Sequence, residues 1–204
     1  MRVARFPAAG ETVLADRLEE VAGGKGLNQA IAAAGRGPCA FVGAIGDDAA
    51  GRMLLDRLQR GGVDTTWVAW VSEPTGRAFI EVVPDGENRI VVAPLANGHL
   101  GADVVRDALD RLAPAVVLAQ LEVPLEAVAA AAAWTAAHDA RFVLNASPVA
   151  ALPHDLLARC DPLVVNRVEA SAMLPHGARP GEDVGASADR LAEQVTSVVV
   201  TDGP

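Results

Sequence analysis

The chain has 204 residues, of which 51% are hydrophobic and 3% aromatic, and its formal net charge is −9. This length suits one α/β domain with a sizeable core. Because the chain is acidic and carries no basic stripe, nucleic acid and anionic membrane surfaces are not expected as partners. The longest apolar run, residues 127–137, is short and rich in alanine, so no membrane span is expected.

Cys39 and Cys160 are the only cysteines. They lie far apart in the sequence and form no C-x-x-C pair, which favours free thiols in a reducing compartment and leaves a disulfide as the alternative. Residues 1–7 lack the apolar core of a signal peptide. The expected location is therefore the cytoplasm.

The first part of the chain is expected to start extended and then to alternate between helix and strand. The expected elements are an extended segment over 1–22, a helix over 27–34, a strand over 39–45 and a helix over 49–60. The aspartates that precede the second helix are suited to cap it, and the two glycines that follow are suited to end it.

Residues 65–93 have a different character, because three extended runs follow one another with no helix between them. These runs are 65–71, 75–83 and 88–93. The Pro-Asp-Gly-Glu sequence between the last two has the chemistry of a hairpin turn. The sequence therefore predicts antiparallel strands inserted into an otherwise alternating chain.

After residue 97, short apolar strands alternate with helices. Helices are expected over 103–112, 125–138, 152–160, 168–174 and 187–195, and strands over 115–120, 141–145, 162–165 and 197–201. This alternation predicts a parallel sheet covered by helices. Polar residues follow the strands at 120–122, Asn145, Asn166 and 201–203, which predicts a ligand cleft along the carboxyl ends of the strands.

The most distinctive loop is residues 23–26, in which three glycines surround Lys25 just before the first helix. The amides of a helix N-terminus, the lysine charge and the Asn28 side chain suit a polyhydroxylated or anionic ligand. An ordinary tight turn is the alternative. The loop lacks the earlier glycine and the hydroxyl residue of a P-loop, and Gln29 replaces the third glycine of a Rossmann fingerprint.

Ordered blocks along essentially the whole chain resemble the ribokinase, or PfkB-type, carbohydrate kinase family. The blocks lie at 5–12, 23–30, 43–51, 62–65, 75–78, 86–88, 120–124, 166–169 and 200–203. The forms Gly-Gly-Lys-Gly-x-Asn-Gln and Gln-Leu-Glu look most like the ribokinase branch. The resemblance implies a three-layer α/β domain over residues 1–204, with a mostly parallel sheet flanked by helices. It also implies a small β lid, formed by about 1–20 and 65–93.

The resemblance implies phosphoryl transfer from ATP, with Mg²⁺, to a hydroxyl of ribose or a related sugar, and it leaves room for a monovalent cation such as K⁺. The implied sugar contacts are Gly24, Lys25, Gly26, Asn28, Ala78, Ile80 and Glu122. The implied nucleotide contacts are Asn166, Thr201 and Gly203, with Glu169 acting near Mg²⁺ through water. Other pentoses, ketohexoses and nucleosides follow ribose as candidate substrates.

Each of these residues also has a purely structural interpretation. Glu122 could be a solvated loop carboxylate, and Ala78 and Ile80 could serve ribbon packing only. Asn166 could be a helix cap, and Glu169 could complement a helix dipole. Because the inserted strands carry apolar residues on both faces, the outer face is expected to pack on a partner's lid in a homodimer.

Several positions depart from the family pattern. The family's first strand would precede Met1, and its Gly-Ala-Gly-Asp block with the catalytic base would follow Pro204. No catalytic residue is therefore assigned, and residues 1–204 are expected to be inactive by themselves. Arg167 and Asp202 replace a usual acid and a usual apolar residue, which weakens the match on the nucleotide side. A non-catalytic remnant or sugar-binding scaffold of the same fold is the alternative function.

Overall fold

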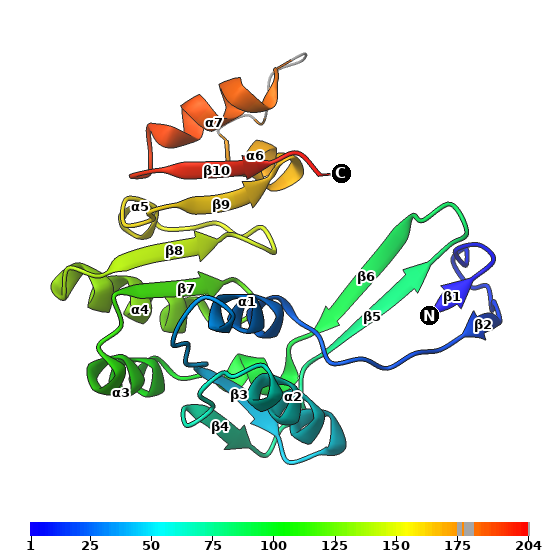
Figure 1. Cartoon of the computed structure of the whole chain (residues 1–204). Helices are drawn as coiled ribbons and strands as arrows, with labels where there is room; N and C mark the ends of the chain where they lie inside the picture. Colours follow the sequence, from blue (N-terminus) through cyan, green and yellow to red (C-terminus); the bar gives the residue numbers. More distant parts are fainter. Residues whose placement is uncertain (175–176, 178–181, 204) are drawn as a thin grey trace. The chain divides into compact units, whose positions relative to one another are not determined.

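The computed structural model describes residues 1–174, 177 and 182–203. The chain forms two compact units, Met1–Asn97 and residues 98–204. In the described part of the chain, no helix has the length and apolar character that crossing a membrane requires. Both units combine parallel strands with helices, as the α/β expectation requires (Figure 1).

The first unit contains two helices and a pair of parallel strands. The helices are α1 (Lys25–Ala34) and α2 (Ala49–Arg60), and they contact each other. The strands β3 (Gly43–Gly46) and β4 (Val68–Val71) pair in parallel. The buried core between these elements consists of Leu27, Ala30, Leu58 and Val63. Residues 65–71 were expected to belong to the inserted antiparallel strands, and the parallel pairing of β4 shows that this part of the prediction is wrong.

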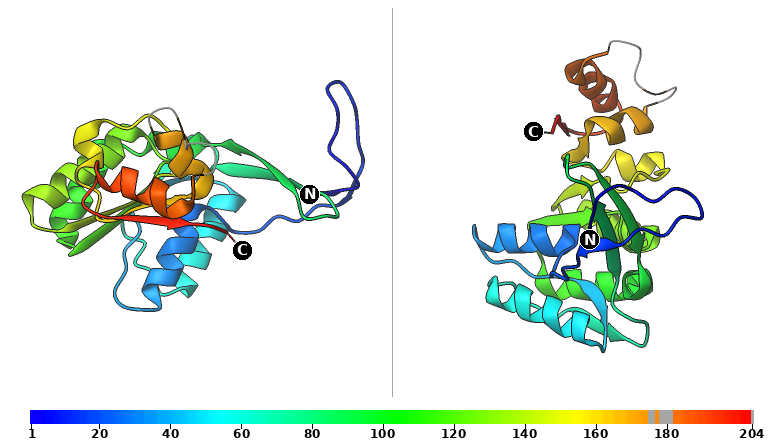
Figure 2. Two further views of the ribbon diagram at one scale, coloured as in Figure 1. Left: turned by 90° about the horizontal axis from the view of Figure 1, so that it is seen from above. Right: turned by 90° about the vertical axis from the view of Figure 1, so that its right-hand side faces the viewer.

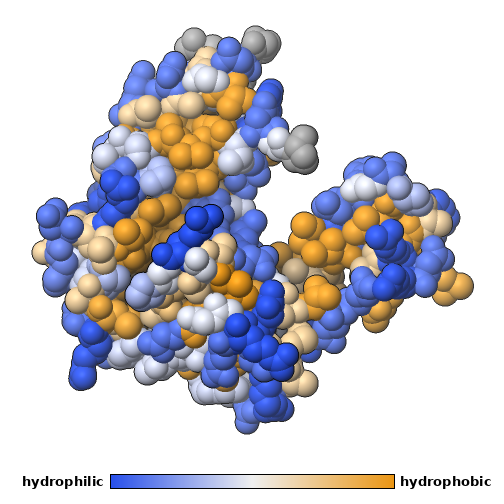
Figure 3. Space-filling view, in the orientation of Figure 1, coloured by the Kyte–Doolittle hydropathy of each residue, from blue (hydrophilic) through white to orange (hydrophobic). Residues whose placement is uncertain are grey.

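The second sheet of this unit has four strands in the order β2-β1-β5-β6. They are β1 (Arg2–Val3), β2 (Ala15–Arg17), β5 (Arg77–Val82) and β6 (Asn88–Ala93). The β5–β6 hairpin, called the ribbon below, is antiparallel throughout, as the sequence predicts (Figure 2). Figure 3 shows apolar surface on the part of the molecule that contains the ribbon. By strand register, large exposed apolar side chains lie on both faces of the ribbon: Phe79 and Val91 on one, and Ile80, Ile90 and Val92 on the other.

The second unit is built on four parallel strands in the order β10-β9-β8-β7. They are β7 (Val116–Gln120), β8 (Arg141–Asn145), β9 (Leu163–Asn166) and β10 (Val198–Thr201). The helices are α3 (Ala102–Leu112), α4 (Leu125–Ala137), α5 (His154–Leu157), α6 (Arg167–Met173) and α7 (Val184–Ala192). A 3₁₀ turn, Leu95–His99, leads from the first unit into the second.

One face of this sheet forms the core of the second unit. Its most deeply buried side chains are Phe142, Leu144, Leu163 and Val165. Helix α4 contacts β7 and β8, α6 contacts β9 and β10, and α7 contacts β10. Val116, Leu118 and Val199 are exposed, so helices of this unit cover one face of its sheet.

Two helices of the second unit have other ends than the sequence predicts. Helix α7 starts at Val184, earlier than expected, because the Asp183 side chain accepts a hydrogen bond from the Ala186 amide at 2.8 Å. Helix α5 is shorter than the expected span of 152–160 and begins directly after Pro153. Proline is well suited to the first positions of a helix and poorly suited to its interior.

Candidate functional site

The glycine-rich loop places four of the predicted sugar contacts in the first turn of α1. Gly24 is the N-cap, and its φ of 111° is a conformation that favours glycine. The first intrahelical bond runs from the Asn28 amide to the Gly24 carbonyl at 3.1 Å. The amides of a helical first turn have no intrahelical acceptor, and here no cap side chain and no first-turn carboxylate covers them. Gly24, Lys25, Gly26 and Asn28 therefore form one polar, electropositive end of a helix.

The two predicted lid contacts lie on β5. Ala78 pairs with Val92 and Ile80 with Ile90, so these side chains share one apolar face of the ribbon. All four residues are exposed. The segment that leads into the glycine-rich loop is tied to the same strand, because Arg77 donates to the Glu20 carboxylate at 2.9 Å.

The second unit gathers the other predicted polar residues at the carboxyl ends of its parallel strands. Gln120 is in register with Asn145, and Asn166 is in register with Thr201. The Asn145 side chain also donates to the Val164 carbonyl at 3.1 Å. The expected row of polar side chains at one edge of a parallel sheet is therefore present. Glu122 follows β7 and is half-buried, and it is the one predicted sugar contact that belongs to this unit.

Asn166 and Glu169 form a reciprocal capping box at the start of α6. The Glu169 amide donates to Asn166 Oδ1 at 2.8 Å, and the Asn166 amide donates to Glu169 Oε2 at 2.8 Å. The structural interpretation of Asn166 as a helix cap is therefore confirmed, and Glu169 completes the capping box. Any contact of either residue with a nucleotide must add to this role. Among the described residues, no three His, Cys, Asp or Glu side chains are grouped as metal ligands. One carboxylate fits only an indirect contact with Mg²⁺, which commonly keeps several waters.

The two departures on the nucleotide side, Arg167 and Asp202, are partners of each other, and the sequence did not predict this pairing. Arg167 Nε donates to Asp202 Oδ1 and its terminal NH2 to Asp202 Oδ2, both at 2.6 Å. This hydrogen-bonded pair lowers the pKa of the Asp202 carboxyl from its usual range. The pair joins the first residue of α6 to the segment after β10, next to Thr201 and Gly203. The only sequence signal was that both positions depart from the same pattern.

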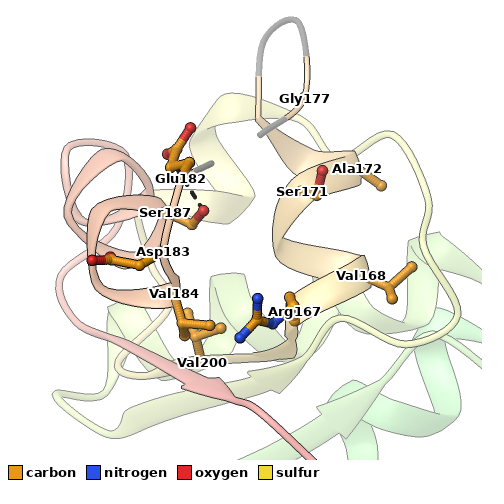
Figure 4. Close-up of a pocket in the computed structure, with 10 residues that line it drawn as sticks. All are labelled: Arg167, Val168, Ser171, Ala172, Gly177, Glu182, Asp183, Val184, Ser187 and Val200. Atoms are coloured by element: carbon orange, nitrogen blue, oxygen red, sulfur yellow. Dashed lines mark hydrogen bonds between the residues drawn. The ribbon is translucent and has the colours of Figure 1, made fainter. Parts of the chain in front are cut away.

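A pocket of about 610 Å³ lies beside this pair, between α6, α7 and β10 (Figure 4). Arg167, Ser171, Asp183, Ser187 and Val200 are among its lining residues. None of the predicted nucleotide contacts belongs to this lining. The pocket is therefore a neighbour of the predicted nucleotide side rather than that site itself.

Comparisons with known proteins agree with the motifs. The family model for pfkB family carbohydrate kinases matches residues 1–204. A ribokinase of Haemophilus influenzae is 39% identical over 171 residues, which are 82% of this chain and 56% of the relative. A ribokinase of Schizosaccharomyces pombe is 35% identical over 202 residues, which are 94% of this chain and 64% of the relative. The chain thus spans less than two thirds of the length of either relative.

A solved structure gives the same relationship at the level of the fold. Arabidopsis thaliana ribokinase, in complex with ribose and ATP, matches with a TM-score of 0.79 at 28% identity. The match covers 98% of this chain and 66% of the Arabidopsis chain.

Proposed function

The chain belongs to the pfkB family of carbohydrate kinases, and on that basis we propose that it serves ATP-dependent phosphorylation of ribose or a related sugar. The observation that carries the proposal is the first turn of α1, where Gly24, Lys25, Gly26 and Asn28 present amides, a cation and a carboxamide together. Such a group of donors suits the several hydroxyls of a sugar. The Arabidopsis relative was solved with ribose and ATP, which supports ribose as the first substrate to test.

The proposed sugar contacts have different roles. The first turn of α1 holds hydroxyls, Glu122 accepts a hydrogen bond from a further hydroxyl, and Ala78 and Ile80 of the lid close over the ring. The lid consists of the β2-β1-β5-β6 sheet. Closing an apolar lid over a polar sugar excludes water from the reacting hydroxyl.

On the nucleotide side, Asn166 at the end of β9 contacts the phosphates of ATP, and Thr201 and Gly203 begin the nucleotide loop at the end of β10. Mg²⁺ would neutralise charge on the transferring phosphoryl group, and Glu169 would orient its water shell. A monovalent cation such as K⁺ is part of the same proposal, on family resemblance alone.

No residue is assigned as the catalytic base. The two aspartates that precede α2 are engaged elsewhere, because Asp47 pairs with Arg52 and Asp48 caps α2. We therefore expect residues 1–204 alone to release no ADP in response to sugar. The alternative function is a sugar-binding scaffold without catalysis. A kinase and a scaffold differ in whether the product of the whole reading frame turns over ATP.

The proposal includes a cytoplasmic homodimer formed through the lid. The apolar residues exposed on both faces of the ribbon support this partner. Sedimentation of the product of the whole reading frame at micromolar concentration tests it, and a monomer would contradict it.

The test of the sugar site is calorimetry of ribose binding to the product of the whole reading frame, with Asn28→Ala as the variant. Loss of a buried hydrogen bond to a hydroxyl should cost about 1–3 kcal/mol. Gln59→Ala, which removes an exposed carboxamide from α2 in the same unit, is the matched control and should leave ribose affinity unchanged. Equal ribose affinity in Asn28→Ala and the unsubstituted protein would contradict the assignment.

A further inference from the structure

A single carboxylate joins three elements at the base of the ribbon. Asp48 Oδ1 accepts hydrogen bonds from the Gly51 amide at 2.7 Å and from the Thr75 hydroxyl at 2.7 Å. Asp48 Oδ2 accepts from the Thr75 amide at 2.9 Å. The Thr75 hydroxyl in turn accepts from the Gly46 amide at 3.0 Å. The end of β3, the start of α2 and the residue that leads into β5 are thus held by one Asp48–Thr75 pair.

The backbone packs closely around this pair. Thr75 is only 1% exposed. A Cβ on Gly46 would lie 2.4 Å from the Glu73 carbonyl oxygen, and a Cβ on Gly51 would lie 2.2 Å from the Gly46 carbonyl oxygen. Both obstacles are backbone atoms, which cannot rotate away. Glycine at these two positions is what allows the backbone to approach the pair so closely.

The returning strand of the ribbon is fastened at the same place. The Ala96 amide donates to the Pro74 carbonyl at 2.9 Å, directly beside Thr75. Ala96 is fully buried. A Cβ on Gly76 would lie 2.8 Å from the Pro94 carbonyl oxygen. The entering and leaving chains of the ribbon therefore share one base, called the ribbon root below and consisting of Asp48, Thr75, Gly76 and Ala96.

The ribbon root carries a charged group, Asp48, and has another, Arg77, beside it. The Gly51 amide, followed by the hydroxyl and amide of Thr75, lowers the pKa of Asp48 to about 2, and the Arg77 charge acts in the same direction. Asp48 is thus ionised at neutral pH. Arg77 also pairs with Glu20 in the segment that leads into the glycine-rich loop. The root is therefore connected to both the ribbon and the chain that carries the sugar loop.

We propose that Asp48 and Thr75 are positioning residues that fix the ribbon through its root and thereby set where Ala78 and Ile80 meet the sugar. Beyond the root the ribbon is largely exposed, and a two-stranded hairpin by itself is marginally stable. Its direction therefore depends on how its base is held. The statement about sugar rests on the proposed function, whereas the statement about the ribbon does not.

Hydrogen–deuterium exchange on residues 1–204 tests the fixing of the ribbon. Thr75→Val removes the hydroxyl at nearly constant shape, and peptides covering β5, β6 and residues 94–97 should exchange about tenfold faster. Thr135→Val is the matched control, because Thr135 is also 1% exposed and its hydroxyl donates to the Ala132 carbonyl within α4. Equal exchange of the ribbon peptides in Thr75→Val and Thr135→Val would overturn the proposal.

Two further variants keep the test decisive if Thr75→Val folds poorly. Thr75→Ser retains the hydroxyl and should restore ribbon protection. Arg77→Gln breaks the exposed link to Glu20 and should loosen the ribbon to a smaller extent. Loss of protection in Thr75→Ser equal to that in Thr75→Val would show that the hydroxyl is not what holds the ribbon.

Kinetics on the product of the whole reading frame test the consequence for sugar. Thr75→Val should raise the KM for ribose about tenfold and leave the KM for ATP within about threefold of that of the unsubstituted protein. Thr75→Ser should restore the KM for ribose. A loosened ribbon with an unchanged KM for ribose would overturn the positioning role. If the unsubstituted protein shows no sugar-dependent turnover, the proposed function fails, and the exchange experiment still decides whether the root fixes the ribbon.

Discussion

The capping box of α6 offers a way to separate a structural role of Asn166 from a role in nucleotide binding. Asn166→Ala removes the oxygen that accepts the Glu169 amide. Loss of an N-cap typically costs about 1 kcal/mol of unfolding free energy. Asn166→Asp keeps an acceptor of equal capping strength, so its cost in stability should be close to zero. Asn166→Ala should therefore be less stable than Asn166→Asp.

The same two variants should differ in the opposite direction in ATP affinity. If Asn166 contacts a phosphate, Asn166→Asp places a negative charge beside another. Two unit charges about 4 Å apart interact by about 1 kcal/mol in water and by about 4 kcal/mol near a protein surface. A loss of roughly fivefold or more in ATP affinity is thus expected for Asn166→Asp, in a protein that unfolds at the same urea concentration.

Urea unfolding and ATP calorimetry on the product of the whole reading frame would measure both effects. Asn88→Asp, at an exposed position at the start of β6, adds the same charge to the other unit and should leave ATP affinity unchanged. Unchanged ATP affinity in Asn166→Asp would refute the nucleotide contact and leave Asn166 as a cap only. A stability loss in Asn166→Asp as large as in Asn166→Ala would refute the capping argument.

Two other predictions follow from pKa values. The Gly51 amide first and then Thr75 lower the pKa of Asp48 from 3.8 to about 2, and Arg5 first and then the Ala8 amide lower that of Glu11 from 4.5 to about 2. Both lowered pKa values stabilise the folded state at any pH above the ordinary pKa values of these groups. This stability is lost as the pH falls towards about 2. Unfolding free energies between pH 6 and pH 2 should therefore decline on the acid side, and less steeply in Asp48→Asn. A rise in stability over that range would contradict the assignment. Burial raises the pKa of Cys160 to about 12, so a thiol reagent at about pH 8 should leave Cys160 unmodified in the folded protein and modify it in urea. Rapid labelling of Cys160 in the folded protein would show that the thiol is accessible.

The parts of the fold that sequence could predict are those set by local signals. Helix α2 was predicted over its full length because local signals mark both of its ends. Asp48 stands directly before the helix, and two glycines follow it directly. The α/β class follows from the alternation of the second half. The glycine-rich loop was located for a similar reason, since its glycines directly precede the helix that they begin.

What sequence could not predict depends on pairing between distant residues. Residues 65–71 are extended as expected, but nothing in their pattern says that β4 pairs in parallel with β3. The Asp48–Thr75 and Arg167–Asp202 pairs join residues that are 27 and 35 positions apart. Each of these residues has an ordinary local explanation, as a cap or a loop charge, which conceals the pairing until the chain is folded.

The central claim is that these residues belong to a kinase that acts on ribose or a related sugar, and sugar-dependent formation of ADP tests it most directly. ADP release should be measured for the product of the whole reading frame and for residues 1–204, with ATP, Mg²⁺ and ribose, fructose or adenosine at millimolar concentration. The account predicts turnover that depends on sugar, greatest with ribose, in the former and none in the latter. ADP release at the rate of the protein-free blank with every sugar, in the product of the whole reading frame, would contradict it.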